Sequence, residues 1–350
     1  VDQLAWSFDS ASNSEAFDYL ATGETLTLTY TVRVTDNNNT TDDQTVTLTI
    51  TGTNDAPIIT AGPDTASLTE TNAGLTTSGT LTISDIDRTD LVTATRALAV
   101  SGTSDRSDPA APSDADLLAM FSLDGSTSSN TLSATEQSDT LNWSFDSGLE
   151  AFDYLELGET LILTYTVTAT DDDNTALSDS ETVTITITGT NETPVITGGA
   201  DTAALTETDT TITTTGSFAV TDADTKDLVS ATVSSVALSG SFTTSGSTLP
   251  SALSASSYQA LIDMLDLTIA SGSTGTDTTT DGTIQALDAN TATSGSTVDW
   301  TFTSGSSGDS AFDFLRDGET LTLPYTLTLQ DDSGDTASDT TTTTVAITIT

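Results

Sequence analysis

The strongest constraint on the fold is an internal repeat as long as a whole domain. Three short motifs each occur three times: a tryptophan and a phenylalanine two residues apart, Ala-Phe-Asp followed by an aromatic residue and leucine, and Gly-Glu-Thr-Leu. Their copies begin at residues 6, 143 and 300, at 16, 151 and 311, and at 23, 158 and 318. A spacing this long corresponds to a complete domain and not to one coil of a solenoid.

Two further motifs occur twice and indicate where each unit begins. Thr-Gly-Thr-Asn at 51–54 returns at 188–191, and an Asp-x-Asp stretch at 84–92 returns at 221–229. Both pairs of copies have the same separation along the chain, so they belong to one kind of unit.

The motifs together divide the chain into three parts. We predict the carboxyl-terminal part of an incomplete β-sandwich repeat at 1–53, a complete repeat at 54–190 and a second complete repeat at 191–350. The last repeat is longer because of Ser/Thr/Gly-rich residues around Gly272–Gly295. We expect this insertion to form an expanded surface loop.

Apolar and polar residues alternate in Leu26–Val34, Val46–Ile50 and Val183–Ile187. A period of two predicts strands with one buried face and a threonine-rich face in water. Asp- and Asn-rich turns at 36–39 and 171–174 separate such strands, which indicates antiparallel pairs. Helical spacing, where we expect short connecting helices, occurs only at Ala115–Phe121 and Tyr258–Leu265.

The chain is strongly acidic. It carries 52 Asp and Glu residues against 6 Lys and Arg and no His, which is a formal net charge of −46. Such a surface repels nucleic acids and anionic membranes, so we expect neither as a partner. Cysteine is absent, which excludes disulfides and thiolate metal sites. No apolar stretch is long enough to span a bilayer and no leader opens the chain at Val1, so we expect a removed signal or an interior piece of a longer protein.

The recurring aromatic residues are expected to form the core. Trp143, Phe145, Phe152 and Tyr165 return at corresponding places because a sandwich needs large apolar side chains at fixed inward positions. Burying each such side chain contributes about 1.5–3 kcal/mol. A platform that stacks against sugars is the alternative interpretation. The tyrosine also resembles the corner tyrosine of immunoglobulin-like sandwiches, whose hydroxyl closes a loop.

Antiparallel alternation predicts that acidic residues from distant segments meet at one pole of each repeat. If the linker enters at that pole and the first strand runs away from it, the second strand returns and ends at the Asp-x-Asp loop. The strand through the recurring tyrosine also ends there. At the first junction the expected cluster is Asn54, Asp55, Asp85, Asp87, Asp90 and Asp171. At the second junction it is Asn191, Glu192, Asp222, Asp224, Asp227 and Asp331.

Carboxylates held a few ångströms apart repel one another unless a cation neutralises them. A set of carboxylate and amide oxygens without His or Cys favours a hard cation, and calcium accepts about six to eight irregular oxygen ligands more readily than magnesium does. The alternative is that these acids only solvate turns. Their recurrence with Asn-Asp and Asn-Glu linkers at domain spacing favours calcium.

At this point the motifs resemble those of known repeats. An Asn-Asp linker before Ala-Pro, an Asp-x-Asp loop and an acid in a late Thr-Asp turn are similar to the cadherin ectodomain pattern, in which such residues bind calcium between domains. Ala-Phe-Asp-Tyr-Leu, Gly-Glu-Thr-Leu-Thr-Leu-Thr-Tyr-Thr-Val and Thr-Gly-Thr-Asn-Asp-Ala-Pro resemble the VCBS repeat of giant bacterial RTX-type adhesins more closely still. The resemblance implies an all-β fold of tandem Greek-key, immunoglobulin- or cadherin-like β-sandwiches in an elongated array.

The resemblance also implies roles for individual residues. The linker, loop and late-turn positions that it makes metal ligands are Asn54, Asp55, Asn191, Asp85, Asp87, Asp222, Asp224, Asp171 and Asp331. It adds Glu70, which would lie at the opposite pole of its repeat and face the junction at Asn191. Two features depart from the pattern: Glu192 replaces the second linker aspartate, and Asp36 belongs to a repeat whose linker is missing. The glycine-rich nonapeptide repeats of RTX secretion tails do not occur in this sequence.

These observations predict calcium-rigidified stalk repeats of a secreted bacterial surface adhesin, which mediate cell adhesion or biofilm attachment at the cell surface. The expected partners are neighbouring repeats or identical subunits. The alternative is a structural subunit of an extracellular filament or surface layer, because the few strands in 1–53 cannot bury a core alone and need strands from upstream chain or another subunit. Direct glycan binding would need exposed aromatic residues beside the acids.

We expect no enzymatic activity. Without His and Cys the usual proton shuttles and thiol nucleophiles are missing, and the lone Lys226 lies in a predicted metal loop. Acids that recur in every repeat suit a module better than a single active site.

Overall fold

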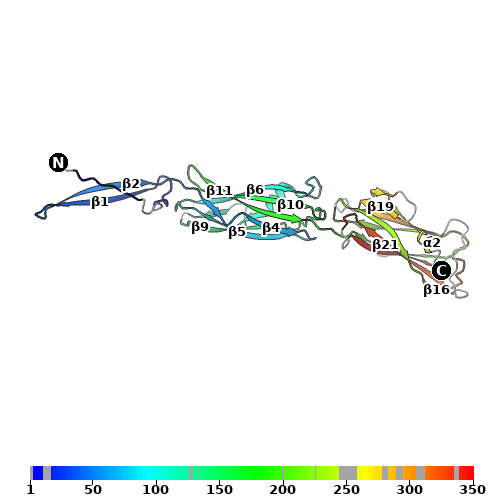
Figure 1. Ribbon diagram of the computed structural model, residues 1–350. Coiled ribbons are helices and arrows are strands. Elements are labelled where there is room, and N and C mark those ends of the chain that lie inside the picture. The colour runs from blue at the N-terminus through cyan, green and yellow to red at the C-terminus, as the bar shows by residue number, and fades with distance from the viewer. Residues whose placement is uncertain are drawn as a thin grey trace.

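The alternating segments form strands that build a rod of three successive units. The computed structural model describes residues 3–10, 17–125, 129–133, 135–198, 201–224, 226–243, 258–277, 283–288, 295–304, 312–334 and 339–350. It contains 54% strand and 3% helix. The units follow one another from the amino-terminal end to the carboxyl-terminal end (Figure 1). The predicted all-β fold of tandem sandwiches in an elongated array is therefore confirmed.

The first unit is a single antiparallel hairpin. Strand β1 (Thr25–Thr35) pairs with β2 (Thr41–Thr51) along its whole length. Asp36 shapes the turn between them, since its Oδ1 accepts hydrogen bonds from the main-chain N–H groups of Asn38 and Thr40, both at 2.8 Å. Among the described residues, neither strand pairs with any other. Within the described residues this unit therefore has one sheet and no second layer of strands.

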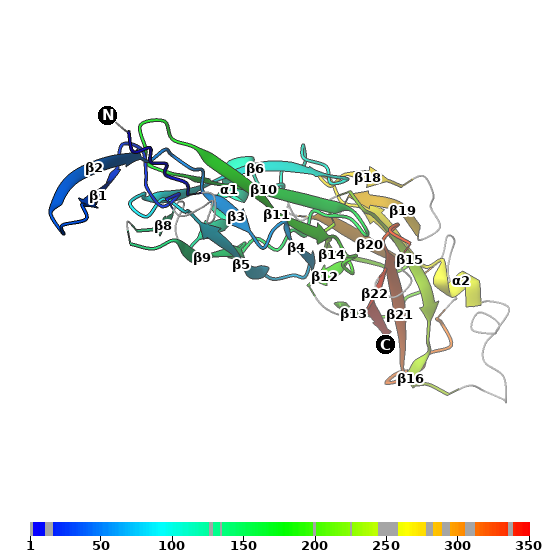
Figure 2. The same cartoon turned by 60° about the vertical axis from the view of Figure 1, so that its left-hand side comes forward.

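The second unit is a sandwich of two sheets. The first sheet has the order β3 (Ile58–Thr60), β5 (Thr76–Ser84), β9 (Ser138–Asp146) and β7 (Phe121–Leu123). The second has the order β4 (Asp64–Thr69), β11 (Ser178–Thr188), β10 (Thr160–Thr170), β6 (Val92–Gly102) and β8 (Ser129–Leu132). All paired strands are antiparallel except β4 and β11. Figure 2 shows the sheet of β6 and β10 lying over the sheet of β5 and β9.

The third unit repeats this architecture with added strands. Its first sheet has the order β12 (Val195–Thr197), β14 (Thr213–Thr221), β20 (Ser296–Thr303) and β17 (Leu265–Ile269). Its second sheet has the order β13 (Asp201–Leu205), β22 (Thr340–Ile349), β21 (Thr320–Gln330), β15 (Leu228–Val236), β19 (Thr283–Asp288) and β18 (Gly275–Thr276). The short strand β16 (Ser239–Ser241) also pairs with β21.

The period-two pattern places the core between the two sheets. In β10 every second residue, from Leu161 to Ala169, is fully buried, while the intervening residues, Ile162 and three threonines, are only partly covered. Trp143 lies in this core, and its indole Nε1 donates a hydrogen bond to Asp64 Oδ2 at 2.9 Å. Position 79 is glycine because a Cβ there would lie 2.6 Å from Trp143 Cζ2. The prediction that Trp143 belongs to the core is confirmed.

The recurring tyrosine closes a connection, as expected, but its acceptor belongs to a helix. The Oη of Tyr165 donates a hydrogen bond to the carbonyl of Leu117 at 2.8 Å, in helix α1 (Asp114–Ala119). In the third unit Tyr325 Oη donates to Leu261 at 2.9 Å, in α2 (Tyr258–Ile262). Both helices end earlier than predicted, because the apolar residues that follow them enter β7 and β17. Neither helix has the length or apolarity needed to cross a membrane, within the described part of the chain.

The expectation of a surface loop around Gly272–Gly295 is wrong in part. This stretch contains β18 and β19, and β19 pairs with β15 as β8 pairs with β6 in the second unit. The physical reason is that Ile284 and Leu287 are fully buried, so they draw the segment into the sheet. Residues 278–282 and 289–294 lie outside the described residues.

Candidate metal centres at the repeat junctions

Three carboxylates meet at the first junction, where the linker from β2 enters the second unit. Asp85, Asp90 and Asp171 are buried, and one carboxylate oxygen of each lies within 4.8 Å of the other two. Linker residue Asn54 joins them, since its Nδ2 donates a hydrogen bond to Asp171 Oδ2 at 3.1 Å. The ends of strands create the cluster: Asp85 follows β5, Asp90 precedes β6 and Asp171 follows β10. Antiparallel alternation thus brings distant segments to one pole.

The remaining predicted residues of this junction shape the loop around the cluster. The main-chain N–H of Asp55 donates to Asp87 Oδ2 at 2.7 Å, and the N–H of Asp87 donates to Asp85 Oδ1 at 3.1 Å. Asp87 is fully buried, whereas Asp55 is exposed. Asp55 therefore contributes its main chain to the ordering of the loop, and its side chain lies at the edge of the cluster.

Several oxygens in this cluster are buried with no hydrogen-bond donor among the described residues. They are Asn54 Oδ1, Asp85 Oδ2, Asp87 Oδ1, Asp90 Oδ2 and Asp173 Oδ2. Burial, followed by the repulsion of neighbouring carboxylates, raises the pKa of Asp85 to about 6 and that of Asp90 to about 7. Unsatisfied acceptors and repelling charges are what a cation at this place would relieve.

The second junction repeats the same set of hydrogen bonds with different residues. The N–H of Glu192 donates to Asp224 Oδ2 at 2.8 Å, and the N–H of Asp224 donates to Asp222 Oδ1 at 3.2 Å. Asn191 Nδ2 donates to Asp331 Oδ2 at 3.3 Å. The replacement of the linker aspartate by Glu192 therefore leaves the main-chain contact in place.

The pKa values of the acids at the second junction are raised further, so the electrostatic conflict among them is larger. Burial is the first cause that raises the pKa of Asp222 to about 7, of Asp224 to about 9 and of Asp227 to about 8. Neighbouring carboxylates add to each shift, and Glu156 does so for Asp227. Asp222 Oδ2, Asp224 Oδ1 and Asp227 Oδ2 have no donor among the described residues. At neutral pH these groups do not all carry their negative charge unless a cation is bound.

Glu70 reaches this junction from the preceding sandwich. It follows β4 at the far pole of the second unit and is almost fully buried. Its Oε2 accepts a hydrogen bond from Thr190 Oγ1 at 2.5 Å, and the same hydroxyl contacts Glu192 Oε1 at 2.9 Å. Burial, together with the charges of Glu192 and Asp153, raises the pKa of Glu70 to about 7. Acids of both neighbouring sandwiches therefore meet across the linker.

Sequence reasoning missed three acidic residues. Asp153 lies beside Glu70, Glu156 faces Asp227, and Asp173 lies beside Asp87 and Asp90. For Asp153 the available signal was its place in the repeated phrase Ala-Phe-Asp, which occurs in all three copies. We used only the aromatic residues of this phrase, which predict burial.

Basic residues of the Asp-x-Asp loops also contact the preceding unit. The Arg88 guanidinium lies over the Tyr19 ring, 5.3 Å from its centroid. At the second junction Lys226 Nζ lies 3.0 Å from Glu159 Oε1, and its main-chain N–H donates to Glu156 Oε1 at 3.0 Å. Both contacts are partly solvent-exposed, so each contributes at most about 1 kcal/mol to holding the units together.

The donor set fits a hard divalent cation. All candidate ligands are oxygens, and several are buried without a donor. At the first junction the side chains of Asn54, Asp85, Asp87, Asp90 and Asp171 would hold it. At the second the corresponding side chains are Glu70, Asn191, Glu192, Asp222, Asp224, Asp227 and Asp331, with Asp153 and Glu156 beside them. A bound cation supplies positive charge that neutralises both sides of the linker.

The solved structures that are similar to the chain include the following three. The chain is similar to EC3-6 of protocadherin gammaB7, with 14% sequence identity, a TM-score of 0.34, and coverage of 93% of this chain and 58% of that chain. It is similar to EC21-23 of human CDH23, with 17% identity, a TM-score of 0.34, and coverage of 92% and 73%. It is also similar to the titin domains z1z2, with 11% identity, a TM-score of 0.28, and coverage of 85% and 97%. No protein-family model matches the chain, and no curated protein sequence matches it.

The substitution Asp224→Asn should weaken calcium binding but leave the stability of the metal-free protein nearly unchanged. Because burial holds the pKa of Asp224 near 9, the metal-free acid and an amide are both neutral at pH 7, so the melting temperature in chelator should change little. With calcium the lost charge should weaken binding at least about tenfold, or about 1.4 kcal/mol. Calorimetric calcium titration and thermal melts measure both. The exposed Asp42 provides the control Asp42→Asn, for which neither quantity should change.

Proposed function

We propose that this chain is a segment of an extracellular adhesion-type rod in which calcium ions at the junctions hold neighbouring sandwiches in line. One observation carries the proposal. At the first linker three buried carboxylates from separate segments lie close together, and at both linkers buried carboxylate oxygens have no hydrogen-bond donor in the described chain. Binding a divalent cation there removes the repulsion and joins groups from two units.

The chemistry of the ligands suits calcium at extracellular concentrations. Extracellular calcium modules bind with dissociation constants of about 10⁻⁴ to 10⁻³ M, so external calcium is sufficient and cytosolic calcium is not. Where a metal site forms only in the folded state, binding free energy becomes folding free energy. The chain would then remain unfolded at the low calcium concentration inside the cell and fold into a rigid rod outside it.

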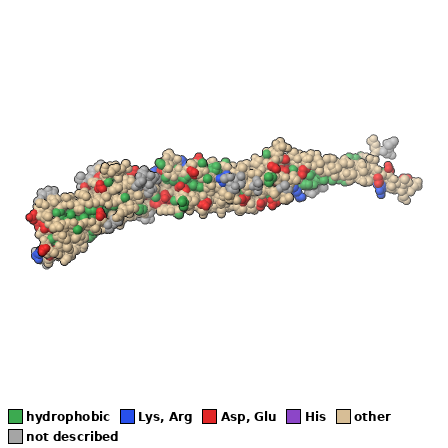
Figure 3. Space-filling model, turned by 180° about the vertical axis from the view of Figure 1, so that it is seen from behind, with side chains coloured by type: hydrophobic (Ala, Val, Ile, Leu, Met, Phe, Trp, Pro, Cys, Tyr) green, Lys and Arg blue, Asp and Glu red, His purple; other side chains and the backbone are tan. Residues whose placement is uncertain are grey.

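More specifically, we propose that this chain consists of stalk repeats of a bacterial surface adhesin of the VCBS type. Two features support this assignment: the phrases that resemble VCBS repeats and the strongly acidic surface, on which basic side chains are few (Figure 3). In such a protein the rod would hold an adhesive tip away from the cell. We propose no catalytic role for the acids, because they recur at both junctions.

Small-angle X-ray scattering tests the mechanical part of the proposal. With saturating calcium we expect the profile of a stiff rod, and with excess EGTA a broader distribution of maximum dimensions, because the units then turn about flexible linkers. Magnesium at the same ionic strength is the matched control and should not restore the stiff profile. Superimposable curves with calcium and with EGTA would remove the support for calcium as the rigidifying agent.

A further inference from the structure

The first unit exposes side chains that the second unit buries. Trp6, Phe8 and Tyr30 have exposed fractions of 59%, 39% and 46%. The corresponding values for their counterparts Trp143, Phe145 and Tyr165 are 2%, 1% and 0%. The expectation that every copy of the aromatic motif is buried is therefore wrong for the first unit. The local sequence is nearly the same, so the difference lies in what covers these side chains.

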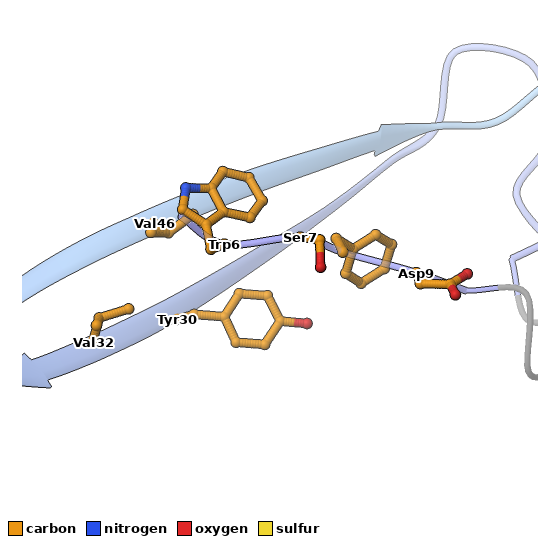
Figure 4. A pocket seen from close by; sticks show the side chains of 7 residues that line it. Trp6, Ser7, Asp9, Tyr30, Val32 and Val46 are labelled. Atoms are coloured by element: carbon orange, nitrogen blue, oxygen red, sulfur yellow. The ribbon is translucent and has the colours of Figure 1, made fainter. Parts of the chain in front are cut away.

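These side chains line one hollow on the apolar face of the hairpin. Figure 4 shows Trp6 and Tyr30 with Val32 and Val46 around it, from β1, β2 and the segment beside them. The hollow has a volume of about 440 Å³ and is mainly apolar. Figure 3 shows hydrophobic side chains reaching the surface along this thin end of the rod. An apolar face of this kind marks an interaction site.

The backbone edges of the hairpin are open as well. In the second unit β10, the counterpart of β1, pairs with β6, and β11, the counterpart of β2, pairs with β4. The counterpart of the Trp6 segment is β9, which lies between β5 and β7. In the first unit β1 and β2 pair only with each other among the described residues, and Gln3–Ser10 is not in a strand. The apolar face and the open edges of the first unit therefore miss the same partners, namely strands that would correspond to β4, β5, β6 and β7.

The second unit shows what fits such a face. There, fully buried Leu81 and Ile83 of β5, Leu117 of α1 and Phe121 of β7 belong to the same core as Trp143. Phe121 stacks on Tyr165 with ring centroids 4.1 Å apart. All four covering residues belong to one continuous stretch that ends before β9. A single segment therefore supplies both the apolar cover and the missing strands.

We infer that the face formed by Trp6, Phe8, Tyr30, Val32 and Val46 is a docking surface for a polypeptide of the same class as residues 54–137, joined on the amino-terminal side of Val1. In the second unit residue 137 is followed directly by Ser138, the counterpart of Val1, so the occupant and the face are continuous in one chain. A second copy of this chain is the less favourable occupant, because its own β5 and β6 are already paired within a sandwich. This inference does not depend on calcium.

The test extends the whole chain by a copy of residues 54–137 placed before Val1. This copy contains no tryptophan, so in a Trp143→Phe/Trp300→Phe background Trp6 is the only reporter. We expect acrylamide quenching of Trp6 to fall several-fold on extension and its emission to shift to the blue. A second extension that carries Ile83→Asp within the copy is the matched control and should leave Trp6 accessible. Equal quenching with and without the unmodified extension would overturn the inference.

Two further measurements cover the case in which the double variant does not fold and test a second copy as the rival occupant. If the double variant does not fold, fluorine NMR of the 5-fluorotryptophan-labelled chain with its tryptophans intact replaces quenching, and the extension should move one of three resonances from a solvent-exposed to a buried position. Sedimentation of the unextended chain tests the rival occupant. A monomer with accessible Trp6 agrees with the inference, whereas a dimer that protects Trp6 would assign the face to a second copy, as a filament requires, and overturn it.

Discussion

Removal of calcium will lower the melting temperature of the second and third units. When a ligand is present at 100 times its dissociation constant, each site adds about 2.7 kcal/mol to the folded state, which corresponds to about 5–10 °C for a domain of this size. The effect should be larger at the second junction, where Glu70 brings acid from the preceding sandwich as well. Differential scanning calorimetry with excess calcium and with excess EGTA measures it.

The control for this experiment separates site binding from general screening. Sodium chloride at matched ionic strength screens the surface charge but does not fill a site of oxygen ligands, so it should restore only a small part of the lost stability. A melting curve that responds to salt and calcium alike would mean that the acids are only solvated turns. This result would contradict the junction sites while leaving the sandwich fold intact.

Phe145→Ala will destabilise the second unit by about 3–5 kcal/mol, the usual cost of deleting a buried aromatic ring. Phe145 is 1% exposed in β9, between the two sheets. The cavity left by the ring has few ways to collapse, because the surrounding positions are also fully buried. Chemical denaturation followed by far-UV circular dichroism should show one transition moving to much lower denaturant.

The matched variant is Phe8→Ala, at the same position of the motif in the first unit. Phe8 is 39% exposed, so its removal should change stability by no more than about 0.5 kcal/mol. This pair tests whether burial, and not the motif itself, determines the contribution of the ring. Equal losses for the two variants would mean that the first unit has a packed core in solution.

Much of the architecture follows from local pattern alone. Alternation at period two predicts β1, β2, β10 and β11, because a half-buried strand must place apolar residues on one side. Motif spacing predicts two complete repeats, and antiparallel alternation predicts which acids lie at each pole. Asp85, Asp90 and Asp171 meet as expected because each lies within two residues of the end of a strand.

Other features depend on contacts that no local pattern contains. Asp153 lies beside Glu70 of its own sandwich, and Glu156 faces Asp227 of the next one. The strand β19 forms inside a polar stretch because β15 offers it a free edge and the core has room for Ile284. Both outcomes are set by neighbours far away in the sequence.

The first two tryptophan motifs show most clearly what the sequence determines and what only the tertiary structure decides. The sequence by itself determined that Trp6 and Trp143 occupy equivalent positions of one repeated motif, with nearly the same neighbours. Only the tertiary structure decided that one is a core residue and the other lies on an open face. The physical reason is that burial requires a second sheet, and that sheet comes from a separate stretch of chain.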